Sequence, residues 1–337
     1  MSDAIRTSAL RPRRRSLLTL AGLMSGAAAL SACTGGTGSG GGAGSGGEGP
    51  VVIATCYPVA FLAGRLGGDA LNVVNLATPG ADAHGLELSV RQVAQLQEAA
   101  LVVQIPGYQA AIDDAIASQG TENVLDVSSV IELLPAGEGE EHEDHAEDSH
   151  EEEANAEEDS HEGHDHGPTD PHFWHDPLRM ADLSDALAER LGEVLPEQAS
   201  AFTEQATALR GELEELDTEL AGMFDPIAGE RPFVTSHAAY TYLASRYDLH
   251  QIGISGVDPE VEPSPQRLLE LEHVIEDEGV TTIFFETTAS PKVAQTLADN
   301  VGVQAEELDN LETQLSEDAD YPQVMRDNAS KLVASWS

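Results

Sequence analysis

The stretch VVIATCYPVAFLAGRLGGDALNVVNLA, residues 51–77, decides the fold class because its hydrophobic pattern changes twice along its length. VVIAT is apolar and rich in β-branched residues, which predicts a strand over 51–55. PVAFLAGRLGG has helical spacing and ends in glycine, which predicts a helix over 58–68. LNVVNLA then predicts a second strand over 71–77. Repeated strand–helix units form a parallel sheet with helices on its faces.

The same alternation continues along the chain. SVRQVAQLQEA predicts a helix over 89–99 opened by Ser89, and ALVVQIP predicts a strand over 100–106. A second run predicts strands over 231–236, 249–255 and 280–286, and helices over 237–247, 264–278 and 290–301. We therefore expect an α/β fold with two lobes, each a parallel sheet flanked by helices.

A helical region separates the two runs. Residues 177–195 and 196–224 keep apolar residues at helical spacing, and Pro196 is placed to open the second helix. We expect an N-terminal lobe over 51–176, linking helices over 177–228 and a C-terminal lobe over 229–337. One long, rigid backbone helix would join the lobes, so we expect them to move little when a ligand binds.

The first 33 residues, MSDAIRTSALRPRRRSLLTLAGLMSGAAALSAC, resemble an export signal that ends at a lipid-modified cysteine. A basic head precedes an apolar run from Leu17 to Leu30, which is short for the roughly 20 residues of a retained membrane anchor. Arg14 and Arg15 also fit a twin-arginine signal, so the export route stays open. Cleavage before Cys33, followed by the Gly/Ser-rich linker 34–50, would tether the protein outside the cell membrane.

The composition narrows the classes of partner. The chain has 60 Asp and Glu against 16 Lys and Arg, a formal net charge of −44, which argues against nucleic acid and direct adhesion to anionic lipid. With Cys33 lipidated, Cys56 has no partner for a disulfide, and we expect it to be buried after the first strand. Residues 137–167 are acidic and histidine-rich with almost no aliphatic side chains, so we expect a disordered loop.

Candidate metal ligands stand after predicted strands or where a loop returns to the fold: His84, His172, His237 and Asp309. Ligands of open α/β sheets bind outside the carboxyl ends of the strands, so two facing lobes could bring these side chains together. Imidazole with a carboxylate suits tetrahedral Zn²⁺. Each residue alone is weak evidence, since single histidines usually pack or face solvent. His175 is an alternative ligand, and Glu286 could support a ligand histidine.

Several stretches match one family: ATCYPVAFLAGRLGGDALNVVNLATPGADAH, ELSVRQVAQLQEAALVV, DPHFWHDPLRMADLSDALAERL, FVTSHAAYTYLASRYDL and ELDNLETQLSEDADYPQVMRDNASKL. On these residues the chain resembles the metal-specific solute-binding proteins of ABC importers, cluster A-I, of the zinc-binding ZnuA type. The motif DPHxWxDP after a histidine-rich insert is the most specific feature. The resemblance covers nearly the whole chain after the linker and implies that metal is bound between two α/β lobes.

The resemblance assigns roles to individual residues. His84 matches the family's first histidine ligand, His172 the second and His237 the third, a position that is often glutamate in manganese binders. Asp309 matches the acidic fourth position, which is filled variably and sometimes replaced by water. The chain departs from the family at ADAHGLEL, where relatives usually have Asp-Pro-His followed by an aromatic residue, Glu and Pro, and at His175, where they usually have an aliphatic residue.

The resemblance implies a protein that captures Zn²⁺ and delivers it to an ABC-type permease in the membrane. With the lipid anchor indicated by residues 1–33, we expect a monomer at the extracellular face of the membrane. The histidines of 137–167 would then capture metal weakly, or the loop would serve only solubility. Two other functions remain open: a metal-binding adhesin or extracellular zinc buffer, and a zinc hydrolase. HExxH, GxSxG and a phosphate-cradling loop are all missing from the sequence, which disfavours the enzyme.

Overall fold

The computed structural model describes residues 49–77, 79–119, 123–137, 169–287, 290–316 and 320–337. The predicted export signal and Cys33, nearly all of the predicted linker, and the histidine-rich loop lie outside these ranges. The described residues belong to one compact unit. Within the described residues, no helix combines the length and the apolar character that crossing a membrane requires.

The first half of the described chain folds into a parallel sheet with strand order β2-β1-β3-β4. Its strands are β1 (Val51–Ala54), β2 (Asn72–Asn75), β3 (Leu101–Gln104) and β4 (Val124–Asp126). The helices between them are α1 (Tyr57–Gly67), α2 (Val90–Glu98) and α3 (Ala110–Gln119). Ser89 and Gln92 form a capping box at the start of α2, as the helix predicted from Ser89 requires.

The second half repeats this topology with strand order β6-β5-β7-β8, again parallel. Its strands are β5 (Pro232–Thr235), β6 (His250–Gly253), β7 (Thr282–Glu286) and β8 (Gln304–Leu308). Its helices are α6 (Thr241–Tyr247), α7 (Pro265–Glu278), α8 (Lys292–Val301) and α9 (Tyr321–Ser335). The two parallel sheets confirm the predicted α/β fold class.

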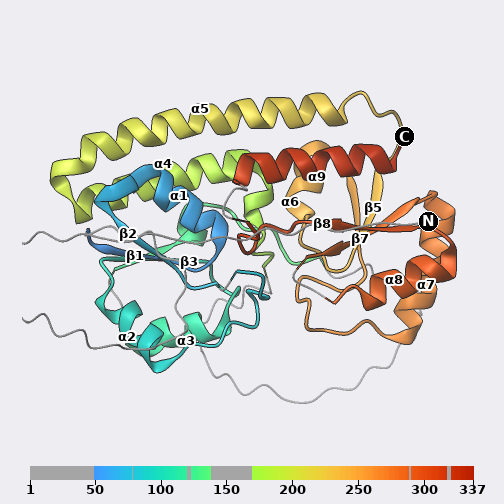
Figure 1. Cartoon of the computed structure of the whole chain (residues 1–337), viewed down its shortest axis with the longest axis horizontal. Coiled ribbons are helices and arrows are strands. Elements are labelled where there is room, and N and C mark those ends of the chain that lie inside the picture. The colour runs from blue at the N-terminus through green and yellow to red at the C-terminus, as the bar shows by residue number, and fades with distance from the viewer. Residues whose placement is uncertain (1–48, 78, 120–122, 138–168, 288–289, 317–319) are drawn as a thin grey trace, which may run out of the picture. The chain divides into compact units, whose positions relative to one another are not determined.

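Two long helices, α4 (Pro177–Val194) and α5 (Ala199–Phe224), connect the sheets. Asp176 caps α4 by accepting from the backbone N–H of Leu178, while 196–198 form a short 3₁₀ turn before α5. The two helices pack as a pair, and Arg210 of α5 bonds Asp182 and Asp185 of α4. Figure 1 shows α5 running above α4 and α9, across both sheets.

The hydrophobic core is continuous across the two halves on the side of the sheets that α4, α5 and α9 cover. It includes Leu62 of α1, Leu187 of α4, Leu216 of α5 and Leu332 of α9, each fully buried. Separate hydrophobic clusters lie between the first sheet and the helices α2 and α3, and between the second sheet and the helices α7 and α8 (Figure 1). The free thiol of Cys56 belongs to the continuous core, as predicted, and burial raises its pKa to about 12.

The predicted helix over 237–247 is wrong at its start, because α6 begins only at Thr241. Residues 236–240 form an irregular loop in which Thr235 Oγ1 donates to the carbonyl of His237 at 2.6 Å. This loop keeps His237 just beyond the carboxyl end of β5. The proposed lobe boundaries and the small lobe movement remain predictions.

Candidate metal centre

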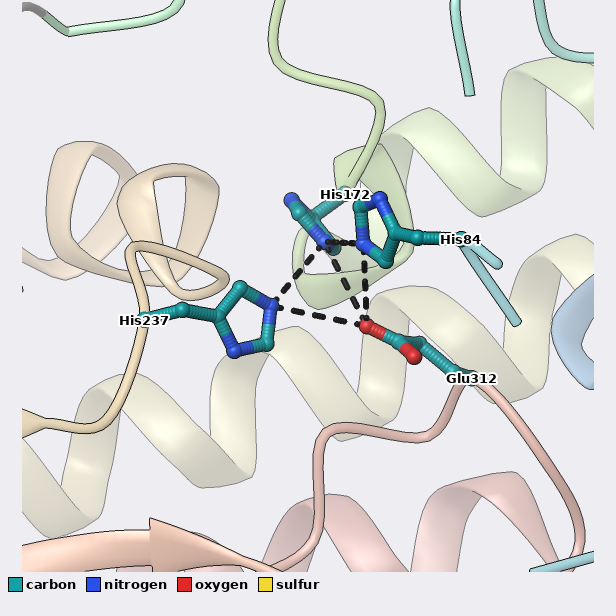
Figure 2. A group of neighbouring side chains, drawn as sticks. All are labelled: His84, His172, His237 and Glu312. Carbon is teal, nitrogen blue, oxygen red and sulfur yellow. Dashed lines mark hydrogen bonds and ion pairs between the residues drawn. The ribbon is translucent and has the colours of Figure 1, made fainter. Parts of the chain in front are cut away.

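Four side chains converge between the two halves of the chain: His84, His172, His237 and Glu312. Figure 2 shows three imidazole rings that direct Nε2 toward one carboxylate oxygen of Glu312. His172 Nε2 lies 3.1 Å from Nε2 of His84 and 3.4 Å from Nε2 of His237. Glu312 Oε1 lies 3.3 Å from Nε2 of His84 and 3.5 Å from Nε2 of the other two rings.

These spacings match the edges of a tetrahedron around zinc. Zinc binds nitrogen and oxygen at about 2.0–2.2 Å, which places neighbouring ligand atoms of a tetrahedron about 3.3–3.6 Å apart. Five of the six separations run from 3.1 to 3.5 Å, and all four atoms lie within 4.8 Å of one another. Three nitrogens and one oxygen are also ligands that zinc prefers. The geometry and chemistry of the group therefore fit Zn²⁺.

Each half of the chain contributes two of these side chains. His84 lies in the loop after β2, and His172 in the segment that leads into α4. His237 follows β5, and Glu312 follows β8. Three of the four thus stand beyond the carboxyl ends of parallel strands, where ligands of such sheets bind.

The loop that carries His84 is fixed by a buried glutamine. Gln109 Nε2 donates to the carbonyl of Ala83 at 2.9 Å and to that of Thr55 at 3.0 Å. The backbone N–H of His84 donates to Oδ1 of Asp82. Tyr108 packs edge-on against the ring of His84, with 4.7 Å between the centroids. The side chain of His84 is 11% exposed, whereas the other three members of the group are buried, so His84 is the group's contact with solvent.

Buried carboxylates orient the other two rings from behind. Asp170 Oδ1 accepts from the backbone N–H of His172 at 2.9 Å and lies 2.8 Å from its Nδ1. A proton on Nδ1 leaves the lone pair of Nε2 free for a metal. Glu286 takes the matching place behind His237: its Oε1 lies 3.2 Å from Nδ1, at an ion-pair distance but outside hydrogen-bond alignment, and accepts from the backbone N–H at 3.3 Å.

A tight turn presents Glu312. The backbone N–H of Leu311 donates to Oδ1 of Asp309, and that of Glu312 donates to Oδ1 of Asn310. Leu311 has φ +62°, a left-handed conformation that is costly for a residue with a Cβ. The carbonyl of Glu312 accepts from the N–H of Tyr57 at 3.0 Å. Among the residues that the structure describes, the buried Oε1 of Glu312 has no hydrogen-bond partner, as expected for an atom directed at a cation.

The electrostatics of the group favour positive charge at its centre. Burial lowers the pKa of His172, but the neighbouring Asp170 and Glu312 outweigh burial and raise it above its usual range. Burial acts in the same direction on His237, and Glu286 and Glu312 overcome it to raise that pKa to about 10. Burial raises the pKa of Glu312, but the three histidines hold it well below its usual range. The raised pKa values of the two histidines and the lowered pKa of Glu312 thus favour positive charge on the rings beside a negative carboxylate.

The structure brings together the three predicted histidines but not Asp309. Asp309 caps the turn, and burial raises its pKa, while Glu312 supplies the carboxylate three residues later. His175 is fully buried and stands outside the group, and burial lowers its pKa to about 3, so its ring is neutral. Sequence reasoning missed Glu312, although the stretch EELDNLE offered it as another acidic residue of the same loop.

Comparisons of the sequence with known proteins find zinc-binding relatives. The zinc-binding lipoprotein AdcA of Streptococcus pneumoniae is 31% identical over 290 residues, which cover 83% of this chain and 54% of that protein. The zinc-binding protein AdcA of Streptococcus pyogenes is 35% identical over 294 residues, 85% of this chain and 56% of that protein. The chain thus spans about half the length of these relatives.

Solved structures share the fold. The laminin-binding protein Lmb of Streptococcus agalactiae, described as bifunctional with adhesin and metal transporting activity, matches with a TM-score of 0.71 and 28% identity. The match covers 86% of this chain and all of Lmb. A crystal structure of ZnuA matches with a TM-score of 0.70 and 25% identity over the same share of this chain. The family model of the periplasmic zinc-uptake complex component A matches residues 52–335, and the chain belongs to this family.

Proposed function

We propose that this protein captures Zn²⁺ outside the cell, holds it with His84, His172, His237 and Glu312, and delivers it to an ABC-type permease. The observation that carries the proposal is the tetrahedral spacing of three Nε2 atoms and one carboxylate oxygen. Membership of a zinc-uptake family supports zinc as the cargo. The Asp309 ligand expected from the sequence is replaced in this proposal by Glu312.

The proposal includes lipid attachment at Cys33, a monomeric state and action at the outer face of the membrane. The sequence of the export signal supports the anchor, and AdcA of Streptococcus pneumoniae is named a lipoprotein. Cys33 lies outside the described residues. Mass spectrometry of the protein extracted from its native membrane tests the anchor, because diacylglycerol on Cys33 adds a defined mass to the first peptide.

We further propose that the bound zinc performs no catalysis. Catalytic zinc sites keep one position open for water, whereas the protein itself supplies four donors here. The donors are also buried except for His84, which leaves little room for a substrate. A rapid hydrolytic activity of the zinc-loaded protein that is lost on chelation would contradict this part of the proposal.

Zinc titration of the purified protein tests the central claim. We expect one tightly bound Zn²⁺ per chain, and a loss of at least about a hundredfold in affinity for His237→Ala, since a buried ligand is removed. His273→Ala is the matched control, because His273 is exposed on α7 and lies outside the group. Wild-type affinity in the His237→Ala variant would refute the site. Growth of a deletion strain in zinc-limited medium, restored by the wild type alone, tests delivery.

The likeness to Lmb favours adhesion as a second candidate function. Binding of the His237→Ala variant to immobilised laminin separates the two, because an adhesin that needs no metal binds laminin without the zinc site. A zinc buffer is distinguished by deleting residues 137–167. Tight one-to-one zinc binding that survives this deletion assigns capture to the four-residue group, and its disappearance assigns capture to the loop.

A further inference from the structure

The indole of Trp174 connects the two halves of the zinc site. Its ring is fully buried and packs against His172, with 5.2 Å between centroids and 73° between planes. Its Nε1 donates to the carbonyl of Asn310 at 2.9 Å. The side chain of Asn310 in turn accepts from the backbone N–H of Glu312. One side chain thus touches a histidine ligand from the first half and holds the turn that carries the carboxylate ligand from the second.

Trp174 is itself held on both sides. The hydroxyl of Tyr321, at the start of α9, donates to the carbonyl of Trp174 at 2.6 Å. On the other side, Tyr108 packs against the indole at 5.6 Å and against the ring of His84 at 4.7 Å. The buried indole therefore contacts the ring of His172 directly and the ring of His84 through Tyr108.

The turn that Trp174 contacts needs such support. Leu311 adopts the left-handed conformation, so the turn relaxes toward other geometries unless its neighbours hold it. Asn328 holds one end, where it exchanges two hydrogen bonds with the backbone of Asp309. The bond from Trp174 to Asn310 holds the middle, directly before Leu311 and Glu312.

We propose that Trp174 is a positioning residue that fixes the Glu312 carboxylate relative to His172 and thereby sets the tightness and geometry of zinc binding. This inference rests on the proposed function. With the indole bond in place, Glu312 Oε1 stays at tetrahedral distance from all three Nε2 atoms. Without that bond, the turn is free to shift, and a zinc–oxygen distance in a well-formed site lies within about 0.2 Å of its standard value.

The test compares the two tryptophans of the chain, which both donate an indole N–H to a backbone carbonyl. Trp174→Phe removes the bond to Asn310 and keeps an aromatic ring against His172. We expect roughly a tenfold to hundredfold loss of zinc affinity, because a buried carbonyl loses its donor and the turn loosens. Trp336→Phe removes the bond to Pro232 at the far end of β5, and we expect zinc affinity within about twofold of the wild type.

A double-mutant cycle with Glu312→Gln separates positioning from general destabilisation. If Trp174 acts through the carboxylate, Trp174→Phe changes the zinc affinity of the Glu312→Gln protein by less than about twofold. The same fold loss in both backgrounds would show that Trp174 stabilises the protein without positioning Glu312. An unchanged affinity in the single Trp174→Phe variant would also overturn the inference.

Two further measurements guard against a variant that fails to fold. Tyr321→Phe removes the hydroxyl that holds the Trp174 carbonyl, and we expect a smaller loss, roughly threefold to tenfold, that again disappears beside Glu312→Gln. Co²⁺ in place of zinc should lose its tetrahedral visible spectrum in Trp174→Phe and keep it in Trp336→Phe, and retention in both contradicts the inference. Failure of the wild type to bind one zinc would instead refute the proposed function itself.

Discussion

Replacement of Glu312 by glutamine removes a buried negative charge and leaves the size of the side chain almost unchanged. Glu312 Oε1 faces three Nε2 atoms at 3.3–3.5 Å and is shielded from water. Removal of one partner from a buried charged cluster costs about 3–5 kcal/mol, and each 1.4 kcal/mol is a factor of ten in affinity. We therefore expect zinc affinity to fall roughly a hundredfold to several thousandfold.

Protonation of the metal-free site reduces this loss at neutral pH. Glu312 helps to raise the pKa of both His172 and His237, so the wild type must release protons before zinc binds. The glutamine variant holds those protons less firmly, which offsets part of the missing charge. We expect the lower end of the range at pH 7.5 and a larger loss at higher pH.

The assay is a competition titration against a zinc chelator of known affinity, with Asp309→Asn as the matched control. Asparagine keeps the Oδ1 acceptor that caps the N–H of Leu311, so we expect less than about a threefold change there. The reasoning is refuted if Asp309→Asn weakens zinc binding more than Glu312→Gln, because the carboxylate nearest the metal would then be the one expected from the sequence.

Three other outcomes follow from the same contacts. Asp170→Asn weakens the hold on Nδ1 of His172, and titration should show zinc affinity about 10–100-fold lower, whereas an unchanged constant excludes this support. Apparent zinc affinity should rise between pH 5.5 and 7.5, since His172 and His237 have raised pKa values and must lose protons to bind, and equal constants contradict this. Burial lowers the pKa of His237, but Glu286 and Glu312 outweigh burial and raise it from 6.5 to about 10. Charged His237 therefore stabilises the metal-free fold fully below about pH 6.5, and this stabilisation is lost as the pH rises through about 10. Thermal melts from pH 7 to 10 should show the metal-free protein losing stability, and a flat profile speaks against the raised pKa.

The fold class could be predicted because its strongest elements are apolar and periodic. The strand VVIAT and the helix opened by Ser89 carry clear signals, and both are present. The strand β8 has none, since Gln304, Glu306 and Glu307 are exposed and the strand exists through its pairing with β7. Sequence periodicity also predicted that the helix α6 begins at His237. In the structure it begins later, because the hydrogen bond from Thr235 Oγ1 to the carbonyl of His237 competes with the helix there.

The candidate site could be predicted in part for a related reason. Histidine is scarce outside the acidic loop 137–167, and the surrounding motifs single out His172 and His237 among the few that remain. Acidic residues are abundant, so nothing in EELDNLE separates Asp309 from Glu312. The choice depends on the left-handed backbone of Leu311, which no local pattern of residues announces. Asp309 contributes through its cap of the turn, and Glu312 faces the histidines.

The division of ligands between the two halves has a mechanical consequence. An ion bound by His84 and His172 from one half and by His237 and Glu312 from the other links the two halves (Figure 2). The free energy of metal binding therefore also stabilises the contact between the halves. Metal–ligand distances in proteins stay within about 0.2 Å of their standard values, so the four ligands hold the ion only while the halves keep their spacing. A receptor that moves the two halves apart would therefore release the ion without supplying any metal ligand of its own.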